Sequence, residues 1–126
     1  MTADADTRAV VERYFAAWTT RNVDEAYALL ADDLRFWGPT ASYRSAAAFR
    51  PALAGFAAMT AAARIIELVV RGDRAALLYD CDLPHPVGTL KIASFFRVDD
   101  GKIQEYDTVF DATELRKLVA RGRTVQ

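Results

Sequence analysis

The feature that most constrains the fold of this chain is a change of hydrophobic period near its middle. Before Arg64, apolar residues recur every three or four positions, which is the spacing of amphipathic helices. From Arg64 onward, they form β-branched and aromatic runs separated by turn signals such as Gly72-Asp73. Short connections between consecutive strands favour antiparallel neighbours, so the sequence predicts an α+β domain whose helices precede its sheet.

Three helices and a short strand are predicted in the front half. Val10, Tyr14 and Trp18 form an apolar stripe on the first helix. Ser45 is a suitable N-cap for the third helix, and Pro51, too deep for a first-turn proline, predicts a kink or a restart there. The helices are expected at 6–21, 22–33 and 45–59, and the strand at 34–37.

Strands and one last helix are predicted in the back half. The strands are expected at 64–70, 75–83, 89–98 and 102–110, and the helix at 112–120. Alternation assigns Ser94 and Phe96 to the helix-covered face of the sheet and Phe95 to the other face. Tyr106 and Thr108 share the covered face on the last strand. Buried polar groups need partners, so these hydroxyls indicate either a partly polar cavity or hydrogen bonds among themselves.

Composition excludes several kinds of partner and site. The 126 residues suit one domain, 1–126, and the 16 Lys and Arg are scattered without a basic stripe, so nucleic acid is not expected. No apolar run approaches the ~20 residues that span a bilayer, and the N-terminus lacks a signal-peptide pattern. The single cysteine, Cys81, fits a reducing cytoplasm. The chain has only one cysteine and one histidine, too few for the three or four ligands of a usual zinc site, so no metal site is expected. No cofactor is expected either.

The uncovered face of the sheet predicts contact with a second copy of the chain. On the strand at 89–98, this face carries Lys91, Ala93, Phe95 and Arg97, which makes it half apolar. Such a face suits another subunit better than open water, so a homodimer is expected.

Three segments carry a family resemblance, AVVERYFAAW, DEAYALLADDLRF and FFRVDDGKIQEYDTVFD with its DGKI turn. Together they cover nearly the whole chain, and their order resembles the nuclear transport factor 2-like superfamily and, within it, the SnoaL-like domains. The resemblance implies a cone-shaped α+β barrel, in which a curved antiparallel sheet wraps around N-terminal helices and encloses an apolar pocket. Members include ketosteroid isomerase, polyketide cyclases, limonene epoxide hydrolase, dehydratases and non-catalytic adaptors, so the fold leaves the function open.

The catalytic set of ketosteroid isomerase is incomplete in this sequence. Tyr14 matches the tyrosine that donates a hydrogen bond to the oxyanion in that enzyme. Gly38 stands where the aspartate base would be, and Ser94 stands where the second donor would be. Isomerisation by that route is therefore not expected.

The sets of the other family enzymes are also broken. Of the Asp–Arg–Asp set of the epoxide hydrolase, Asp82 matches one aspartate, Asp80 lies near the arginine position and Thr108 replaces the other aspartate. The His and Asp on the last strand of the cyclases are matched by Tyr106 and Thr108. The resemblance thus implies a fold without naming a reaction.

Two aspartates two positions apart, Asp80 and Asp82, are the strongest candidates for catalysis. Alignment with the family places them on the pocket side of their strand. Periodicity argues for the opposite face, because the apolar residues Tyr79 and Cys81, which alternate with the aspartates, would naturally be the buried side of the strand. If the pair faces the pocket, poor solvation and mutual repulsion raise at least one pKa. The two carboxyls can then divide acid and base roles while Tyr14 donates to an oxyanion.

Other candidates are assigned by residue type and position. His85 is expected to be an ordinary loop histidine or an acid or base at a pocket mouth, and Cys81 a buried structural thiol. Asp32 and Asp33 are expected to end the second helix. The predicted ligand-binding residues are Trp18, Phe36, Tyr43, Ser94, Phe96, Tyr106, Thr108 and Phe110.

Two classes of function remain open at this point. The first is a cofactor-independent isomerase, cyclase, dehydratase or hydrolase that acts on a small, mostly apolar, oxygenated molecule through Asp80, Asp82 and Tyr14. The second is a non-catalytic small-molecule-binding protein or dimeric accessory protein. The presence of a pocket and the direction of the two aspartates distinguish these classes.

Overall fold

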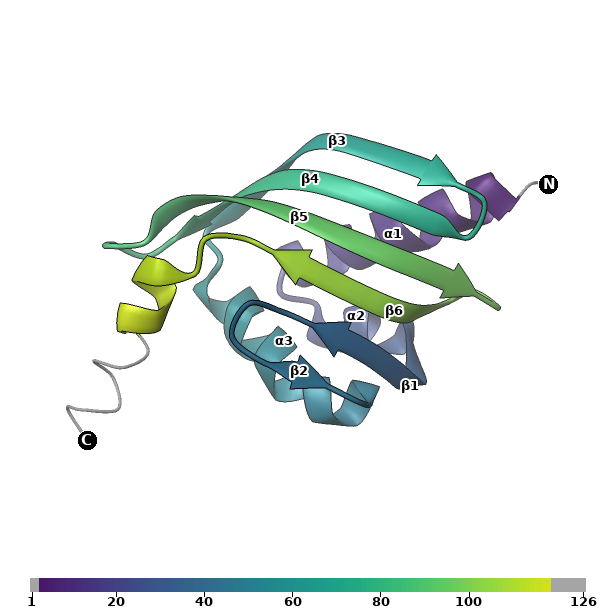
Figure 1. Cartoon of the computed structure of the whole chain (residues 1–126), viewed down its shortest axis with the longest axis horizontal. Helices are drawn as coiled ribbons and strands as arrows, with labels where there is room; N and C mark the ends of the chain where they lie inside the picture. Colours follow the sequence, from purple (N-terminus) through teal and green to yellow (C-terminus); the bar gives the residue numbers. More distant parts are fainter. Residues whose placement is uncertain (1–2, 119–126) are drawn as a thin grey trace.

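Residues 3–118 are described by a computed structural model, and their helices and strands follow the order that the change of period predicts (Figure 1). The elements are α1 (Ala3–Thr19), α2 (Val23–Ala28), β1 (Leu30–Trp37), β2 (Ser42–Tyr43), α3 (Ala46–Met59), β3 (Ala62–Arg71), β4 (Arg74–Leu83), β5 (Gly88–Asp99) and β6 (Lys102–Val109). A further helical segment follows at 113–118. The α+β class and the curved sheet against N-terminal helices are thus confirmed.

The strands form one sheet in the order β2-β1-β6-β5-β4-β3. From β3 to β6, neighbours are antiparallel, as their short connections predict. β1 instead runs parallel to β6, with Phe36 opposite Tyr106. The antiparallel rule applies only to consecutive strands, whereas α3 carries the chain from β2 at one edge to β3 at the other. The sheet is therefore mixed and open, not the fully antiparallel sheet that was expected.

One face of the sheet, called the covered face, packs against the helices (Figure 1). The apolar stripe of α1, including Val10, Tyr14 and Trp18, is buried. Every second residue of β4 from Ala75 to Leu83 is also buried, as the alternation of strand side chains requires. Each large apolar side chain buried in this way contributes about 1.5–3 kcal/mol, so α1 and the sheet stabilise each other.

α3 begins where the sequence predicts and continues past its proline. The Ser45 hydroxyl accepts a hydrogen bond from the backbone N–H of Ala48 at 3.0 Å, which is the expected N-cap. Pro51 lies inside a helix that runs unbroken to Met59, so the predicted restart is wrong. Phe49 and Leu53, buried on either side of the proline, stabilise the helix across this point.

β1 is longer than predicted and α2 is shorter. α2 ends at Ala28, so Asp32 and Asp33 lie in β1 and not at a helix end. The two aspartates fall where the register with β6 is irregular, between Leu30 and Arg35, and both are exposed. The pairing of β1 with β6, the last strand in the sequence, thus makes residues 30–33 a strand and not the end of a helix. The last expected helix is present at 113–118, and residues 119–120 of the prediction lie outside the described range.

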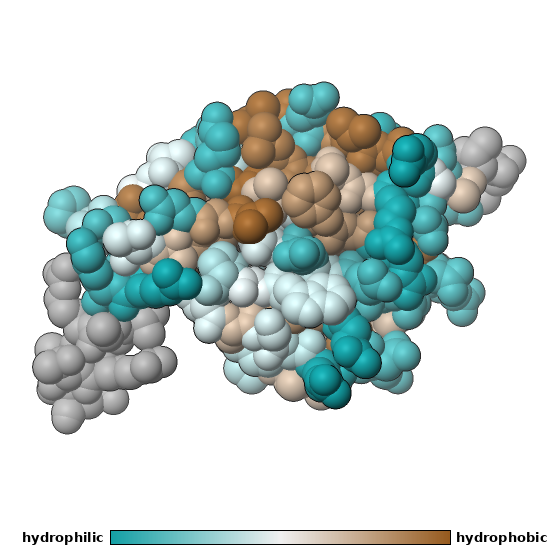
Figure 2. Space-filling view, in the orientation of Figure 1, coloured by the Kyte–Doolittle hydropathy of each residue, from teal (hydrophilic) through white to brown (hydrophobic). Residues whose placement is uncertain are grey.

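The opposite face of the sheet, called the outer face, carries exposed apolar side chains. Trp37, Val69, Phe95 and Val109 have between 43% and 53% of their surface exposed. Figure 2 shows this face, with hydrophobic residues gathered over β3, β4 and β5. The assignment of Phe95 to this face and of Ser94 to the covered face is confirmed.

Arginines from four strands form a row at one end of the outer face, called the arginine row. Cross-strand pairing places its residues in the order Arg71, Arg74, Arg97, Glu105 and Arg35. In Figure 2, hydrophilic residues lie at the end of the sheet where the β3–β4 and β5–β6 turns are found. The sequence shows no basic stripe because these arginines are far apart along the chain. The arginine row forms only when the strands pair in the folded sheet.

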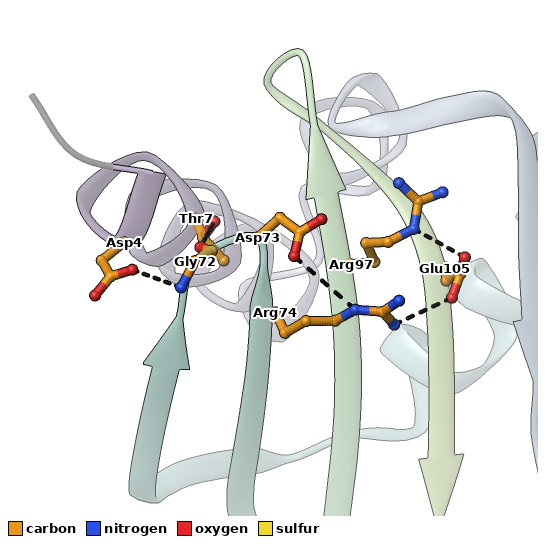
Figure 3. A network of polar contacts seen from close by, with 7 residues as sticks. All are labelled: Asp4, Thr7, Gly72, Asp73, Arg74, Arg97 and Glu105. Atoms are coloured by element: carbon orange, nitrogen blue, oxygen red, sulfur yellow. Dashed lines mark hydrogen bonds and ion pairs between the residues drawn. The ribbon is translucent and has the colours of Figure 1, made fainter.

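Glu105 partly neutralises the arginine row (Figure 3). Its carboxylate accepts hydrogen bonds from Arg97 at 2.8 Å and from Arg74 at 3.3 Å. The hydrogen bond from Arg97 is the main cause that lowers the pKa of Glu105 below its ordinary value. Arg35 and Arg71, at the two ends of the row, have no acidic partner among residues 3–118.

The start of α1 is tied to the turn between β3 and β4 (Figure 3). The Asp4 carboxylate accepts a hydrogen bond from the backbone N–H of Gly72, and the Thr7 hydroxyl donates to the Gly72 carbonyl at 2.7 Å. Gly72 has a φ of 61°, a left-handed conformation that favours glycine. These bonds hold the helix across the sheet and so keep its stripe in place.

Candidate ligand-binding site

A cavity of about 630 Å³ lies between the covered face of the sheet, α3 and the loop that follows β1. This volume is typical of small-molecule pockets, which span roughly 300–1,000 Å³. Its exposed side, called the mouth, is formed by the loop at 38–41 and by Arg116 of the helical segment. The elements that enclose it come from both halves of the chain.

Aromatic rings form most of the cavity wall. Phe36 of β1 stacks on Phe49 of α3 with ring centroids 4.3 Å apart, and it meets Tyr106 of β6 edge-on at 5.0 Å. Trp18 of α1 contacts Phe56 of α3 at 5.7 Å. Such contacts between rings stabilise by about 0.5–1.5 kcal/mol each beyond burial, so the wall is held firmly.

Six of the eight predicted ligand-binding residues line the cavity, namely Trp18, Phe36, Tyr43, Tyr106, Thr108 and Phe110. Ser94 and Phe96 do not. Ser94 is fully buried behind Thr108, and Phe96 packs against Tyr14 and Tyr106. Contact with a ligand stays a prediction for the six residues that line the cavity. For Ser94 and Phe96, that prediction loses its geometric basis.

Other lining residues were missed from the sequence, among them Phe49, Met59 and Arg116. Phe49 and Met59 lie on α3, where apolar residues at helical spacing are expected to be core. Arg116 lies in the helical segment after β6, and only the folding of that segment toward the loop at 38–41 brings it to the cavity. No local pattern in the sequence distinguishes these three from ordinary core and surface residues.

Hydroxyl groups from β4 and β6 supply the polar side of the cavity. Tyr79, Tyr106 and Thr108 line it, and the Thr108 hydroxyl lies 3.0 Å from that of Ser94. Burial is the main cause that raises the pKa of Tyr106 and of Tyr79 above their ordinary values. Both phenols are therefore protonated at neutral pH, and both interact with the buried Ser94 hydroxyl.

Tyr14, predicted to donate to an oxyanion, lies behind the cavity wall. Its side chain is 1% exposed, is absent from the cavity lining and meets Tyr106 edge-on at 5.4 Å. Its hydroxyl makes no hydrogen bond of ordinary geometry with a described residue, although the Tyr106 side chain interacts with it. Burial and then the nearby Tyr106 raise the pKa of Tyr14 well above its ordinary value.

Asp80 and Asp82 point away from the cavity, so the placement that the family alignment implied is wrong. Tyr79, Cys81 and Leu83 are the buried residues at this end of β4, and the aspartates alternate with them on the outer face. Periodicity within the strand predicted this arrangement, whereas the family alignment predicted the opposite face. The proposal that this pair shares a raised pKa in a cavity has no geometric basis.

Asp82 is instead part of a surface contact between strands. Its carboxylate accepts two hydrogen bonds from Arg64 of β3, at 2.8 and 2.9 Å, and one from Thr89 of β5 at 2.7 Å. The Arg64 hydrogen bonds are the main cause that lowers the pKa of Asp82 to about 2. This carboxylate is therefore ionised at neutral pH and bound to its neighbours.

No Asp, Glu or His among residues 3–118 lines the cavity, and no three of the Asp, Glu, His and Cys side chains described lie close enough to hold a metal ion. His85 is exposed in the turn between β4 and β5. Cys81 is fully buried, as predicted, and burial raises the pKa of its thiol. The residues outside the described range contain no Asp, Glu or His. Within residues 3–118, no helix is long and apolar enough to cross a membrane.

A mixed curved sheet that holds a cavity against its helices is the nuclear transport factor 2-like fold, which matched solved structures share. The chain belongs to the SnoaL-like domain family, whose match covers residues 11–106. The resemblance carried by the sequence is confirmed. No curated protein matches the chain in sequence.

Solved structures of several bacterial proteins are similar to this chain. A Kribbella flavida DSM 17836 protein shares 26% identity at a TM-score of 0.83, over 91% of this chain and 95% of that chain. A candidate ketosteroid isomerase from the same organism shares 24% identity at 0.75, over 87% and 81%. An LEH-like epoxide hydrolase of M. tuberculosis shares 20% identity at 0.74, over 96% and 94%. The last two likenesses establish the fold alone.

Proposed function

We propose that this protein binds a small, mostly apolar, oxygenated molecule in the cavity and does not transform it. The observation that carries the proposal is a cavity of about 630 Å³ with an aromatic wall and hydroxyl donors, but with no carboxylate or imidazole among the described residues that line it. Of the two classes of function that the sequence leaves open, this geometry supports the binding protein.

Acid–base catalysis by an isomerase, cyclase, dehydratase or hydrolase requires a group that exchanges a proton near neutral pH. The carboxyls that were expected to do so, Asp80 and Asp82, lie on the outer face. Tyr79 and Tyr106 do line the cavity, but burial raises the pKa of each, so neither is a base at neutral pH. The likeness to the candidate isomerase and to the epoxide hydrolase therefore supports the fold of this chain and does not support their mechanisms for it.

Tyr106 and Thr108 are the groups proposed to recognise the ligand oxygen. Both line the cavity, and Thr108 is oriented by its hydrogen bond with the buried Ser94. A hydroxyl that donates to a carbonyl or hydroxyl in an apolar cavity contributes a net ~0.5–1.5 kcal/mol and fixes the orientation of the ligand. The aromatic wall supplies most of the affinity through burial of apolar surface.

Fluorescence titration with prodan, a neutral naphthalene dye that carries a ketone, tests this function. Saturable binding with blue-shifted emission is expected, because the dye leaves water for an apolar site. Ala52→Trp, which adds an indole to a lining residue of α3, is expected to abolish binding, whereas Ala58→Trp, on the exposed side of the same helix, leaves it intact. Tyr106→Phe is expected to weaken binding by about two- to tenfold.

Two outcomes would contradict the binding function. Equal affinity of the wild type and Ala52→Trp would place the dye outside the cavity. Turnover of a ketone, epoxide or hydroxylated compound that disappears in Tyr106→Phe would restore the enzyme class.

We also propose that two copies of the chain pair through the outer face. Exposed Trp37, Val69, Phe95 and Val109 give this face an apolar centre of the kind that protein contacts cover. Around that centre lie basic side chains, such as Arg71, and acidic side chains, such as Asp80, that form no ion pair among the described residues. One copy therefore offers partners for the charges of the other. The cytoplasmic location that the single cysteine indicates stays a prediction.

A further inference from the structure

Arg116 is the one charged side chain among the described residues that line the cavity. Its guanidinium Nη2 donates a hydrogen bond to the Pro39 carbonyl at 2.7 Å. This bond joins the helical segment at 113–118 to the loop at 38–41, which are the two elements of the mouth. The positive charge is therefore held at the entrance to a cavity that is otherwise apolar or hydroxylic.

Within residues 3–118, the charge of Arg116 has no ion-pair partner. The neighbouring Glu114 pairs with Lys117 at 3.2 Å. Asp111 attracts the Arg116 guanidinium from a distance, but its carboxylate accepts its hydrogen bonds from the hydroxyl and the backbone N–H of Thr113. A guanidinium has five N–H donors, so Arg116 keeps donors free beyond the one used by Pro39.

We propose that the ligand is an amphipathic anion, whose carboxylate or similar acid group binds Arg116 at the mouth while its apolar body fills the cavity. This inference rests on the proposed function, because it names the class of molecule that the cavity takes. A guanidinium offers parallel N–H groups that match the two oxygens of a carboxylate. The aromatic wall cannot solvate an anion, so the charged group stays at the mouth.

The two polar regions together define the ligand further. Tyr106 and Thr108 offer hydroxyls to a neutral oxygen inside the cavity, and Arg116 offers a cation at its mouth. The matching class is an aromatic or alicyclic carboxylic acid that carries a keto or hydroxyl group away from the acid. A neutral ligand would leave the exposed Arg116 guanidinium with the Pro39 carbonyl and water as its partners.

A matched pair of fluorescent dyes tests this inference. 1-Anilinonaphthalene-8-sulfonate and N-phenyl-1-naphthylamine share one aromatic skeleton and differ by a sulfonate. In Arg116→Gln, the affinity for the sulfonate dye is expected to fall about three- to tenfold while that for the neutral dye stays unchanged. Arg116→Lys should recover part of the loss, and added salt should weaken the sulfonate dye selectively.

Control variants separate Arg116 from other positive charges nearby in the sequence. Lys117→Gln removes a cation that does not line the cavity and that pairs with Glu114. Arg121→Gln with Arg123→Gln removes two cations that lie outside the described residues. Both control proteins are expected to bind the two dyes as the wild type does.

The outcomes distinguish this inference from the proposed function. If neither dye binds the wild type, the cavity is not a binding site and both proposals fail. If both dyes bind and Arg116→Gln affects neither, or both equally, the cavity binds ligands but the anionic class is wrong. If Lys117→Gln or the double variant lowers the affinity for the sulfonate dye as much as Arg116→Gln does, the effect comes from general surface charge. That outcome would also overturn the inference.

Discussion

The Tyr14 hydroxyl is buried without a hydrogen bond of ordinary geometry to a described residue, although aromatic rings surround it. A buried polar group left unpaired costs about 1–3 kcal/mol of stability. The phenol of Tyr14 thus gains no hydrogen bond of ordinary geometry to offset its burial. Its neighbour Tyr106 lines the cavity.

Tyr14→Phe is therefore expected to stabilise the protein by about 1 kcal/mol, because it removes the unpaired group and keeps the ring. Thr108→Val is the matched contrast, since it leaves the buried Ser94 hydroxyl without its partner and should destabilise by about 1–2 kcal/mol. Urea unfolding measures both, and prodan titration should show no loss in Tyr14→Phe. A destabilised Tyr14→Phe protein with weakened binding would instead support the donor role that the family resemblance implied.

At the scale of elements, Asp82 links three strands. Its carboxylate on β4 is bound by Arg64 of β3 and Thr89 of β5, and its pKa is lowered to about 2. An ordinary aspartate has a pKa near ~3.9, so the folded state holds the ionised form more strongly than the unfolded state does. The resulting contribution to stability is fully present above that value and is lost as the pH falls toward about 2.

Asp82→Asn should therefore lower the melting temperature at neutral pH and flatten its decline between about pH 4 and pH 2. Asp80→Asn is the matched control, because Asp80 lies on the same strand and face and has no ion pair among the described residues. Melting curves recorded across this range by circular dichroism provide the measurement. An identical acid limb in Asp82→Asn and the wild type would show that the contact with Arg64 and Thr89 does not act on stability.

Local patterns predicted those elements whose structure is decided locally. The helical stripe of α1, the Ser45 cap of α3 and the alternation along β4 are all present. The length and direction of β1 depend on β6, which lies far away in the sequence, so no local pattern contains them. The same holds for the site: its aromatic wall follows from periodicity, whereas Arg116 reaches the cavity only through tertiary folding. For Asp80 and Asp82, the period of two along β4 predicted the observed face, and the family alignment predicted the other one.

At the scale of the whole molecule, the arginine row constrains how two outer faces can meet. In a symmetric dimer, the same face lies on both sides of the interface. A two-fold axis along the strands would place the row against its own copy, and like charges would repel. An axis across the strands places the row over the other end of the partner sheet, where Asp80 lies on the same strand as Arg74. The charge pattern therefore favours the second arrangement.

A charge exchange between Arg74 and Asp80 tests this arrangement. Arg74→Asp and Asp80→Arg should each raise the dimer dissociation constant, by about two- to fivefold for a pair that remains partly exposed. The double variant should recover much of the loss, because the exchanged charges face each other again across the interface. Phe95→Glu, at the apolar centre of the face, should yield monomers. Sedimentation velocity measures each constant. Additive losses in the double variant would exclude the axis across the strands, and a wild type that stays monomeric at high concentration would leave the outer face without a second copy to cover it.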